Sequence, residues 1–184
     1  LDDLGEDLSR YRLTPGRSVQ SLRDSSQEAW VKLYKADAYA ADSQVSYYLK
    51  GAVVALCLDL HLRQQSSSLM QVLRGLWRSH GQWGRGYSEA DLVQAFASGA
   101  ADLASLLPRW LQELDDPDLD GYLSGIGLQL EAEMATAPWV GLSARAEAGL
   151  LMASRVVRGG PAEQAGLMVG DELVAIDGQR LRRP

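Results

Sequence analysis

Apolar residues recur every three or four positions through the first two thirds of the chain, which is the spacing of amphipathic helices. After the turn Thr14-Pro15-Gly16, this spacing predicts a helix through Val19, Leu22, Ala29, Trp30 and Leu33. A longer helix is predicted from Gln44 to about Leu62, with Ser43 as its N-cap. Because its apolar residues lie on most sides, we expect this helix to be buried inside a larger body.

Four further helices are predicted in the same part of the chain. Ser68 can cap the first of them, and Ser88 and Asp91 have the spacing of a capping box before the second. The segment between these two helices, residues 79–86, is rich in Gly and predicts a loop. The four helices are expected through positions 69–76, 92–96, 103–111 and 119–126.

The pattern changes near Gly127, where short alternating or apolar runs bounded by Gly replace the helical spacing. Strands are expected at 128–131, 140–144, 150–157 and 172–176, and Asp177-Gly178 predicts a hairpin turn. The sequence therefore predicts a mainly α chain in three parts: a helical domain over 1–127, a linker over 128–137 and a β-rich domain over 138–184.

Composition and charge narrow the possible classes of protein. Of the 184 residues, 46% are hydrophobic and 23% are charged, which is ordinary for a soluble globular protein. The formal net charge of −6 argues against a nucleic-acid partner, because a phosphate backbone requires a basic face. The longest apolar stretch, 52–62, is shorter than the roughly 18 residues of a membrane-spanning helix, so we expect no membrane partner. A cytoplasmic and a periplasmic location both stay open.

The stretch from Gly159 to Gly178 resembles the middle of a PDZ domain, with a short helix, a Gly-Asp turn, a strand and an Asp-Gly turn in the family's order. PDZ domains bind protein C-termini and extended peptides by strand addition. In this resemblance Val140, Gly141 and Leu142 occupy the loop that holds the peptide's carboxylate, although the second Gly of the common Gly-Leu-Gly-Phe form is missing. The helix that completes the peptide groove is expected after residue 184, so we expect a partial PDZ domain.

Few side chains suit metal or nucleophilic chemistry. Cys57, His61 and His80 lack the paired spacing of a zinc site, so no metal is expected to bind to this chain alone. We interpret His61 as a residue on a helix surface and His80 as a loop residue. Asp59 and Arg63 are four positions apart and predict an ion pair on one helix. The following tryptophans are expected to pack in the core and loops: Trp30, Trp77, Trp83 and Trp110.

Three segments together resemble the glycyl aminopeptidase family of zinc metallopeptidases: Thr14–Leu22, Ala29-Trp30 and Ser43–Arg63. Members of that family have a thermolysin-like catalytic domain followed by a PDZ domain. The resemblance implies a mainly α fold, in which a multi-helical C-terminal subdomain of the peptidase precedes a truncated, β-rich PDZ-like domain. It also implies that the zinc ligands, a His-Glu-x-x-His helix and a downstream Glu, lie upstream in the full-length protein.

Within this resemblance, Tyr48-Leu-Lys-Gly51 is similar to the Tyr-Glu-Lys-Gly segment of related zinc aminopeptidases. There the Tyr hydroxyl donates a hydrogen bond to the oxyanion of the tetrahedral intermediate, and a phenol with an ordinary pKa of about 10 stays protonated for this role. We therefore predict Tyr48 as the oxyanion donor and Tyr47 as the alternative, with Gly51 leaving room for substrate or backbone. From the residues alone, both tyrosines could instead lie at the edge of a helical core.

The resemblance implies a C-terminal fragment of a zinc-dependent aminopeptidase that removes N-terminal Gly or other small residues from peptides. The fragment alone is expected to be inactive, and its PDZ part is expected to bind peptides, protein C-termini or a partner. The alternative is a non-enzymatic adaptor with a helical and a PDZ domain; a PDZ-bearing serine protease is disfavoured because its catalytic domain would be a β-barrel. Exposed sheet edges in a truncated PDZ domain would also favour self-association.

Overall fold

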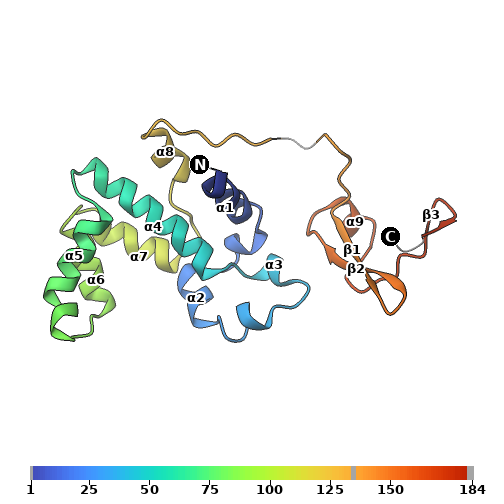
Figure 1. Ribbon diagram of the computed structural model, residues 1–184, viewed down its shortest axis with the longest axis horizontal. Helices are drawn as coiled ribbons and strands as arrows, with labels where there is room; N and C mark the ends of the chain where they lie inside the picture. Colours follow the sequence, from blue (N-terminus) through green and yellow to red (C-terminus); the bar gives the residue numbers. More distant parts are fainter. Residues whose placement is uncertain (1, 134–135, 182–184) are drawn as a thin grey trace.

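The computed structural model describes residues 2–133 and 136–181. Figure 1 shows a helical part built from the first two thirds of the chain and a small β-rich part at the other end of the long axis. Parts of two predicted segments, residues 134–135 of the linker and 182–184 of the PDZ domain, lie outside the described residues. Within the described residues, no helix is long and apolar enough to cross a membrane.

The helical part contains α1 Asp2–Arg12, α2 Leu22–Gln27, α3 Ala40–Ser43, α4 Tyr47–Gln64, α5 Leu69–Ser79, α6 Glu89–Ala97, α7 Leu103–Gln112 and α8 Leu119–Ser124. Three 3-10 turns lie between these helices: η1 Pro15–Ser18, η2 Leu33–Lys35 and η3 Gly81–Trp83. The β-rich part contains β1 Leu142–Glu147, β2 Leu150–Val156, α9 Pro161–Gln164, β3 Ala175–Ile176 and β4 Gln179–Arg180.

The longest helix, α4, lies at the centre of the helical part (Figure 1) and contacts α1, α2, α5 and α8. Its buried apolar side chains lie on several faces: Val53, Val54, Cys57, Leu58, Leu60 and Leu62. They join one hydrophobic core with residues of the surrounding helices, among them Leu8, Leu76 and Leu107. This arrangement confirms the prediction of a buried helix that is apolar on most sides.

The start of α4 differs from the prediction. Ser43 is the last residue of α3, and the N-cap of α4 is Ser46. The two helices are separated because Gln44 has an extended backbone, with φ −145° and ψ 159°. The predicted role of Ser43 as N-cap was therefore wrong.

The first predicted helix is also shorter than its apolar spacing suggested. α2 begins after Ser21, whose side chain accepts a hydrogen bond from the backbone N–H of Asp24, and Glu28 is its C-cap. The chain then forms turns instead of a continuous helix through Leu33, and Trp30 is exposed. The spacing of apolar residues was misleading here because Trp30 does not belong to the core.

Both predicted N-caps of the next helices are confirmed. The Ser68 side chain accepts a hydrogen bond from the backbone N–H of Gln71. Ser88 and Asp91 form a full capping box, in which the Ser88 N–H donates to the Asp91 carboxylate over 2.8 Å and the Asp91 N–H donates to the Ser88 hydroxyl over 3.2 Å. Hydrogen bonds from the Ser88 backbone and side chain lower the pKa of Asp91.

The β-rich part contains the antiparallel pair β1–β2, with an irregularity between Ser143 and Ala144, and the small pair β3–β4. Asp177 and Gly178 both have positive φ, 52° and 75°, as a two-residue type I′ hairpin requires, so the predicted turn is confirmed. The predicted strand at 128–131 was wrong. Its alternation arises because Leu128 and Leu130 pack against the helical core from a segment that forms no strand.

The predicted fold class, mainly α with a small β-rich C-terminal part, is confirmed. The helical part and the β-rich part each have their own hydrophobic cluster, the smaller of which contains Ala153, Val156 and Ala162. The exact domain limits at 127 and 138 stay a prediction.

Candidate active site

The tyrosine pair predicted to carry the chemistry lies in the first turn of α4. Its hydroxyls meet a third tyrosine: the Tyr34 hydroxyl lies 3.3 Å from that of Tyr47 and 3.3 Å from that of Tyr48. The rings of Tyr47 and Tyr48 have centroids 4.1 Å apart, and Trp30 packs against the Tyr34 ring at 5.2 Å. Three phenol groups from two segments therefore form one cluster, which we call the tyrosine cluster.

The tyrosine cluster is open to solvent rather than buried in the core. Tyr48 is 63% exposed. It also lines a cavity of about 390 Å³ between α1 and the start of α4, together with Asp7, Arg10 and Thr14. A hydroxyl at this position is accessible to a ligand, which a hydroxyl packed within the core would not be.

Hydrogen bonds within the cluster give its members different acidities. The hydroxyls of Tyr34 and Tyr47 stabilise the ionised form of Tyr48, so the pKa of Tyr48 is lowered. The pKa of Tyr47 is raised, because its hydrogen bonds to Tyr34 and Tyr48 favour its neutral form. A phenol with a lowered pKa is a better hydrogen-bond donor to a developing negative charge, and on this criterion Tyr48 is better suited than Tyr47.

The segment that leads into α4 is held by residues of the region 16–25. Gly16 packs so closely on Gln44 that a Cβ at position 16 would lie 2.0 Å from the Gln44 carbonyl oxygen. The Gln20 side-chain oxygen accepts a hydrogen bond from the Val45 N–H over 3.1 Å, and the Ser25 hydroxyl donates to the Val45 carbonyl oxygen. Just before Tyr47 and Tyr48, both the N–H and the carbonyl oxygen of Val45 are therefore held by hydrogen bonds.

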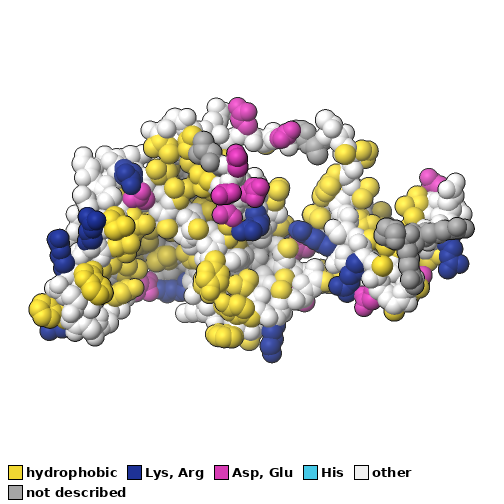
Figure 2. All heavy atoms as spheres, in the orientation of Figure 1, with side chains coloured by type: hydrophobic (Ala, Val, Ile, Leu, Met, Phe, Trp, Pro, Cys, Tyr) yellow, Lys and Arg dark blue, Asp and Glu magenta, His cyan; other side chains and the backbone are white. Residues whose placement is uncertain are grey.

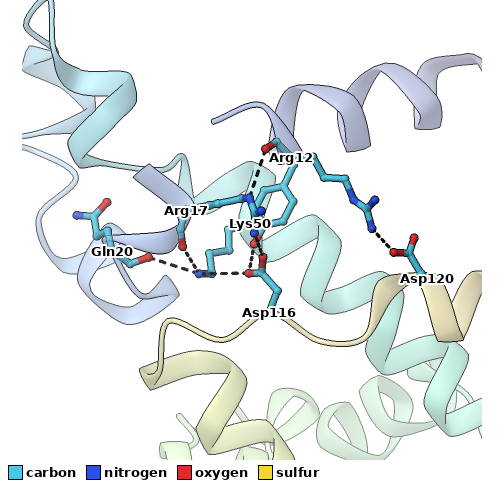
Figure 3. Close-up of polar contacts among 7 residues, drawn as sticks. Arg12, Arg17, Gln20, Lys50, Asp116 and Asp120 are labelled. Atoms are coloured by element: carbon cyan, nitrogen blue, oxygen red, sulfur yellow. Dashed lines mark hydrogen bonds and ion pairs between the residues drawn. The ribbon is translucent and has the colours of Figure 1, made fainter. Parts of the chain in front are cut away.

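Lys50, two positions after Tyr48, is fully buried at the centre of a polar network (Figure 3). Its Nζ donates to the carbonyl oxygens of Arg17, at 3.1 Å, and Gln20, at 3.4 Å, and lies 3.5 Å from a carboxylate oxygen of Asp116. Asp116 also accepts hydrogen bonds from the Tyr11 hydroxyl and the Arg17 guanidinium. Burial lowers the pKa of Lys50, whereas the nearby Asp116 carboxylate opposes that shift.

The other aromatic residues are placed differently from the prediction. Trp30, Trp77 and Trp83 are exposed, and of the four tryptophans assigned to packing only Trp110 is buried. Trp77 lies over Gly81, where a Cβ would be 2.3 Å from its ring, so the ring is held on the surface. Figure 2 shows hydrophobic side chains on the surface over α2 and the segment that follows it, which is the region of Trp30 and Tyr34.

His61 is buried, so its interpretation as a surface residue was wrong. Its Nδ1 lies 2.9 Å from the Tyr122 hydroxyl and its Nε2 lies 3.0 Å from a carboxylate oxygen of Asp102. The hydrogen bond with His61 lowers the pKa of Asp102. The sequence pattern missed this role because both partners lie far along the chain, and the contacts link α4 to α8 and to the start of α7.

Two smaller predictions about charged side chains can also be compared with the structure. The ion pair on α4 is confirmed, with the Arg63 Nε 2.7 Å from an Asp59 carboxylate oxygen. His80 lies directly after α5, as predicted for a loop residue, and its ring meets the edge of Tyr87. Among residues 2–133 and 136–181, no group of three or more His, Cys, Asp or Glu side chains is arranged to hold a metal ion.

The segment predicted to bind peptide leads into β1, and its last residue, Leu142, is the first residue of that strand. Gly141 has a positive φ of 69°, and its carbonyl oxygen accepts a hydrogen bond from the Val157 N–H over 2.8 Å. The Val140 carbonyl oxygen accepts from the Ala162 N–H over 2.9 Å, while the Val140 side chain is exposed. These bonds fix the loop against α9, but they do not test a binding role for Val140, Gly141 and Leu142.

Comparison with known proteins finds two family models that each match a part of the chain. Residues 1–54 match the family model of the M61 glycyl aminopeptidases, and residues 152–184 match that of the PDZ domain. The predicted resemblance to the M61 glycyl aminopeptidases is confirmed. The M61 match includes the start of α4, with Tyr47, Tyr48 and Lys50, as well as Tyr34 and the segment 14–20 that supports them.

A solved structure supports the same relationship over nearly the whole chain. It is the crystal structure of an aminopeptidase N family protein from Idiomarina loihiensis, which is 29% identical in sequence and superposes with a TM-score of 0.83. The alignment covers 97% of this chain and 34% of the solved chain, so this chain spans about a third of that protein's length. No curated protein sequence matches the chain.

Sequence reasoning singled out Tyr48 in the segment Tyr48-Leu-Lys-Gly51, a role that stays a prediction, but gave no sign of the residues that contact this segment. Tyr34 lies 14 positions before Tyr48, and its residue type alone gives no sign of the shared hydroxyl contacts. Asp116 lies in the loop between α7 and α8, outside the M61 match. Several of its neighbours in the sequence are also acidic, so the residue type alone does not distinguish it from them.

Proposed function

We propose that the chain is the C-terminal part of a zinc-dependent aminopeptidase and that Tyr48 acts in its active site. The observation that supports this role is the position of the Tyr48 hydroxyl, which is exposed at the start of a firmly held helix and hydrogen-bonded to Tyr34. We further propose that the substrates are peptides with N-terminal Gly or another small residue, as the family resemblance implies.

In this proposal the Tyr48 hydroxyl donates a hydrogen bond to the scissile carbonyl oxygen as negative charge develops on it. Tyr48 is the second residue of α4, an 18-residue helix whose N-terminus carries partial positive charge that also favours a nearby oxyanion. Loss of one such donor commonly lowers turnover by about 10²–10³-fold, which corresponds to about 3–4 kcal/mol in the barrier. Tyr47 is the alternative donor, although its raised pKa makes it the weaker candidate.

Zinc is not placed on the described part of this chain, which offers no cluster of ligands for it. We propose that the ligands belong to another part of the full-length peptidase and that the 184-residue chain alone does not hydrolyse peptides. The chain's own contribution is then to orient the tyrosine cluster toward the substrate carbonyl.

We also propose that the C-terminal part, from about residue 138 onward, is a PDZ domain that binds extended peptides or protein C-termini. The PDZ match at 152–184 supports this assignment, and Val140, Gly141 and Leu142 are the proposed contacts for the peptide. The same match supports the alternative function, a non-enzymatic adaptor that binds partner tails. Both proposals divide the chain at about residues 127 and 138.

The experiment that tests the enzymatic role uses the full-length peptidase and a peptide with an N-terminal Gly. Tyr48→Phe removes one hydroxyl and keeps the ring, and kcat is expected to fall about 10²–10³-fold while KM changes little. Tyr39→Phe, at another exposed tyrosine of the same region, serves as the matched control and is expected to retain normal turnover.

Near-normal turnover of Tyr48→Phe would show that Tyr48 is not the donor. If Tyr47→Phe then gave the large loss, the role would pass to Tyr47. If the unmodified full-length protein hydrolysed no peptide but bound peptides through its PDZ domain, the adaptor function would replace the peptidase.

A further inference from the structure

We propose that Lys50 is a positioning residue for Tyr48: through its buried ammonium group it fixes the first turn of α4, and with it the Tyr48 hydroxyl, against the segment 15–20 and the loop containing Asp116. This inference rests on the proposed role of Tyr48 and adds a residue that does not itself touch substrate. It starts from the observation that Lys50, two positions after Tyr48, has no exposed surface.

A buried ammonium group is costly unless it is surrounded by acceptors, because it loses its hydration. Lys50 has three oxygen partners from two parts of the chain: the carbonyls of Arg17 and Gln20 and the carboxylate of Asp116. Figure 3 shows these partners arranged around the end of the side chain. Asp116 also accepts hydrogen bonds from Arg17 and Tyr11. The cost of burial is thus fully offset only when both segments are in place.

The position of Lys50 on the helix explains why this contact would fix Tyr48. The Lys50 N–H closes the first turn of α4 by donating to the Ser46 carbonyl oxygen over 2.9 Å, so its backbone belongs to the same turn as Tyr48. A buried side chain that points inward from this turn limits both rotation of the helix about its axis and movement along it. The exposed Tyr48, on the opposite side of the same turn, is held by the same constraint.

A second set of contacts acts on the same segment from the other direction. Gln20, whose carbonyl accepts from Lys50, also uses its side chain to accept a hydrogen bond from the Val45 N–H. One residue therefore connects the backbone before Tyr47 to the side chain after Tyr48. In this arrangement the hydroxyl of Tyr48 lies 3.3 Å from that of Tyr34.

The test compares Lys50→Met with Lys35→Met in the full-length peptidase. Lys35 is an exposed lysine at the end of η2 and makes none of the contacts around Lys50, so its replacement makes the same chemical change without touching the network. Because a misplacement of about 1 Å can cost about 10²-fold in rate, Lys50→Met is expected to lower kcat about 10- to 100-fold with KM within about twofold. Lys35→Met is expected to change neither constant.

A second readout follows Tyr48 itself and does not depend on catalysis. Tyrosine labelled with ¹³C at Cζ gives a resonance that moves when the hydroxyl ionises, and Tyr48→Phe identifies the Tyr48 signal. Loss of the contact with Tyr34 in Lys50→Met is expected to move the Tyr48 titration to higher pH, toward that of a free phenol. A residue that only contributed to stability would leave this titration in place while the protein remains folded.

The outcomes separate this inference from the proposed function. If Tyr48→Phe lowers kcat but Lys50→Met changes neither kcat nor the Tyr48 titration, the inference is overturned and the role of Tyr48 stands. If Tyr48→Phe retains turnover while Lys50→Met still shifts the titration, the positioning contact is supported and the oxyanion role fails.

If Lys50→Met does not fold, Asp116→Asn provides the second test. This variant keeps the shape of the side chain and one oxygen acceptor, removes the negative charge and replaces the second acceptor oxygen by an NH2 group. It is expected to change kcat and the Tyr48 titration in the same direction as Lys50→Met but to a smaller extent, about 3- to 10-fold in kcat. An unchanged kcat together with an unchanged Tyr48 titration in folded Asp116→Asn would overturn the inference.

Discussion

Replacement of Gly16 by Ala should destabilise the protein through a single steric contact. A Cβ at position 16 would lie 2.0 Å from the carbonyl oxygen of Gln44 and 2.5 Å from its carbonyl carbon and nitrogen. Non-bonded heavy atoms pack at about 3.5–4.0 Å, so one backbone segment would have to move by more than about 1 Å. Gln44 cannot move freely because its N–H is bonded to the Ala40 carbonyl oxygen and the next residue, Val45, is bonded to Gln20 and Ser25.

Overpacking at a fixed site of this kind typically costs about 1–3 kcal/mol of unfolding free energy. For a chain of this size, that cost corresponds to a fall in Tm of about 3–9 °C, measured by circular dichroism on the 184-residue chain. Because the displaced segment leads directly into Tyr48, kcat of the full-length peptidase should also fall, by up to about 10²-fold.

The matched control is Gly75→Ala in the interior of α5, where a Cβ would meet no atom within 4 Å. This change replaces Gly by a better helix former in open space, so it should raise stability by about 0.5–1 kcal/mol. A Gly16→Ala variant with a Tm equal to or above that of the unmodified chain would refute the steric reasoning. A lowered Tm with normal kcat would instead show that the segment before α4 does not determine the position of the Tyr48 hydroxyl.

Two further predictions concern the tyrosine cluster and its surroundings. At Gly51, inside α4, a Cβ would meet only the Leu22 Cδ1 at 3.8 Å among the described residues, so Gly51→Ala should raise Tm by about 1–3 °C. If turnover of the full-length peptidase falls in the same variant, the space beside Gly51 is used by substrate or by the rest of the enzyme; unchanged turnover would show that this space has no role. In Tyr34→Phe the pKa of Tyr48 should rise, because its hydrogen bond from Tyr34 is lost. In the proposed mechanism Tyr48 must be protonated to donate, so activity would be present below its pKa and lost as pH rises through it, and the alkaline limb of the kcat profile should move to higher pH. A limb that stays in place or moves to lower pH would contradict the contact.

Local signals in the sequence predicted local structure well. The capping box at Ser88 and Asp91 and the hairpin turn at Asp177-Gly178 were predicted correctly because each depends on residues at most three positions apart. The existence of α4 followed from the length of its apolar run. Its start did not, because the extended conformation of Gln44 is set by Gly16, Gln20 and Ser25, which come from an earlier segment.

The residues of the candidate site likewise could be predicted only where the signal is local in the sequence. Tyr48 is predicted as a site residue from a motif of four consecutive residues, so the prediction needs no information from elsewhere in the chain. The network around Lys50 joins Tyr11 to Asp116, which are 105 positions apart, and no periodicity connects positions at such a separation. His61 was misjudged for a related reason: the apolar residues of α4 lie on most sides, so the pattern could not indicate which side faced α7 and α8.

The contacts that hold the start of α4 are directed mostly at backbone atoms. Lys50 binds the carbonyl oxygens at positions 17 and 20, Gln20 and Ser25 bind the amide and carbonyl of Val45, and Gly16 packs on the backbone of Gln44. Such contacts depend on the path of the supporting segment rather than on the side chains that it carries. Replacing the lysine, glutamine, serine or glycine that makes such a contact therefore removes or distorts it. Replacing the side chain at most of the contacted positions leaves the backbone group in place. In the proposed function, the position of the Tyr48 hydroxyl therefore depends on this backbone path more than on packing around its ring, which is exposed.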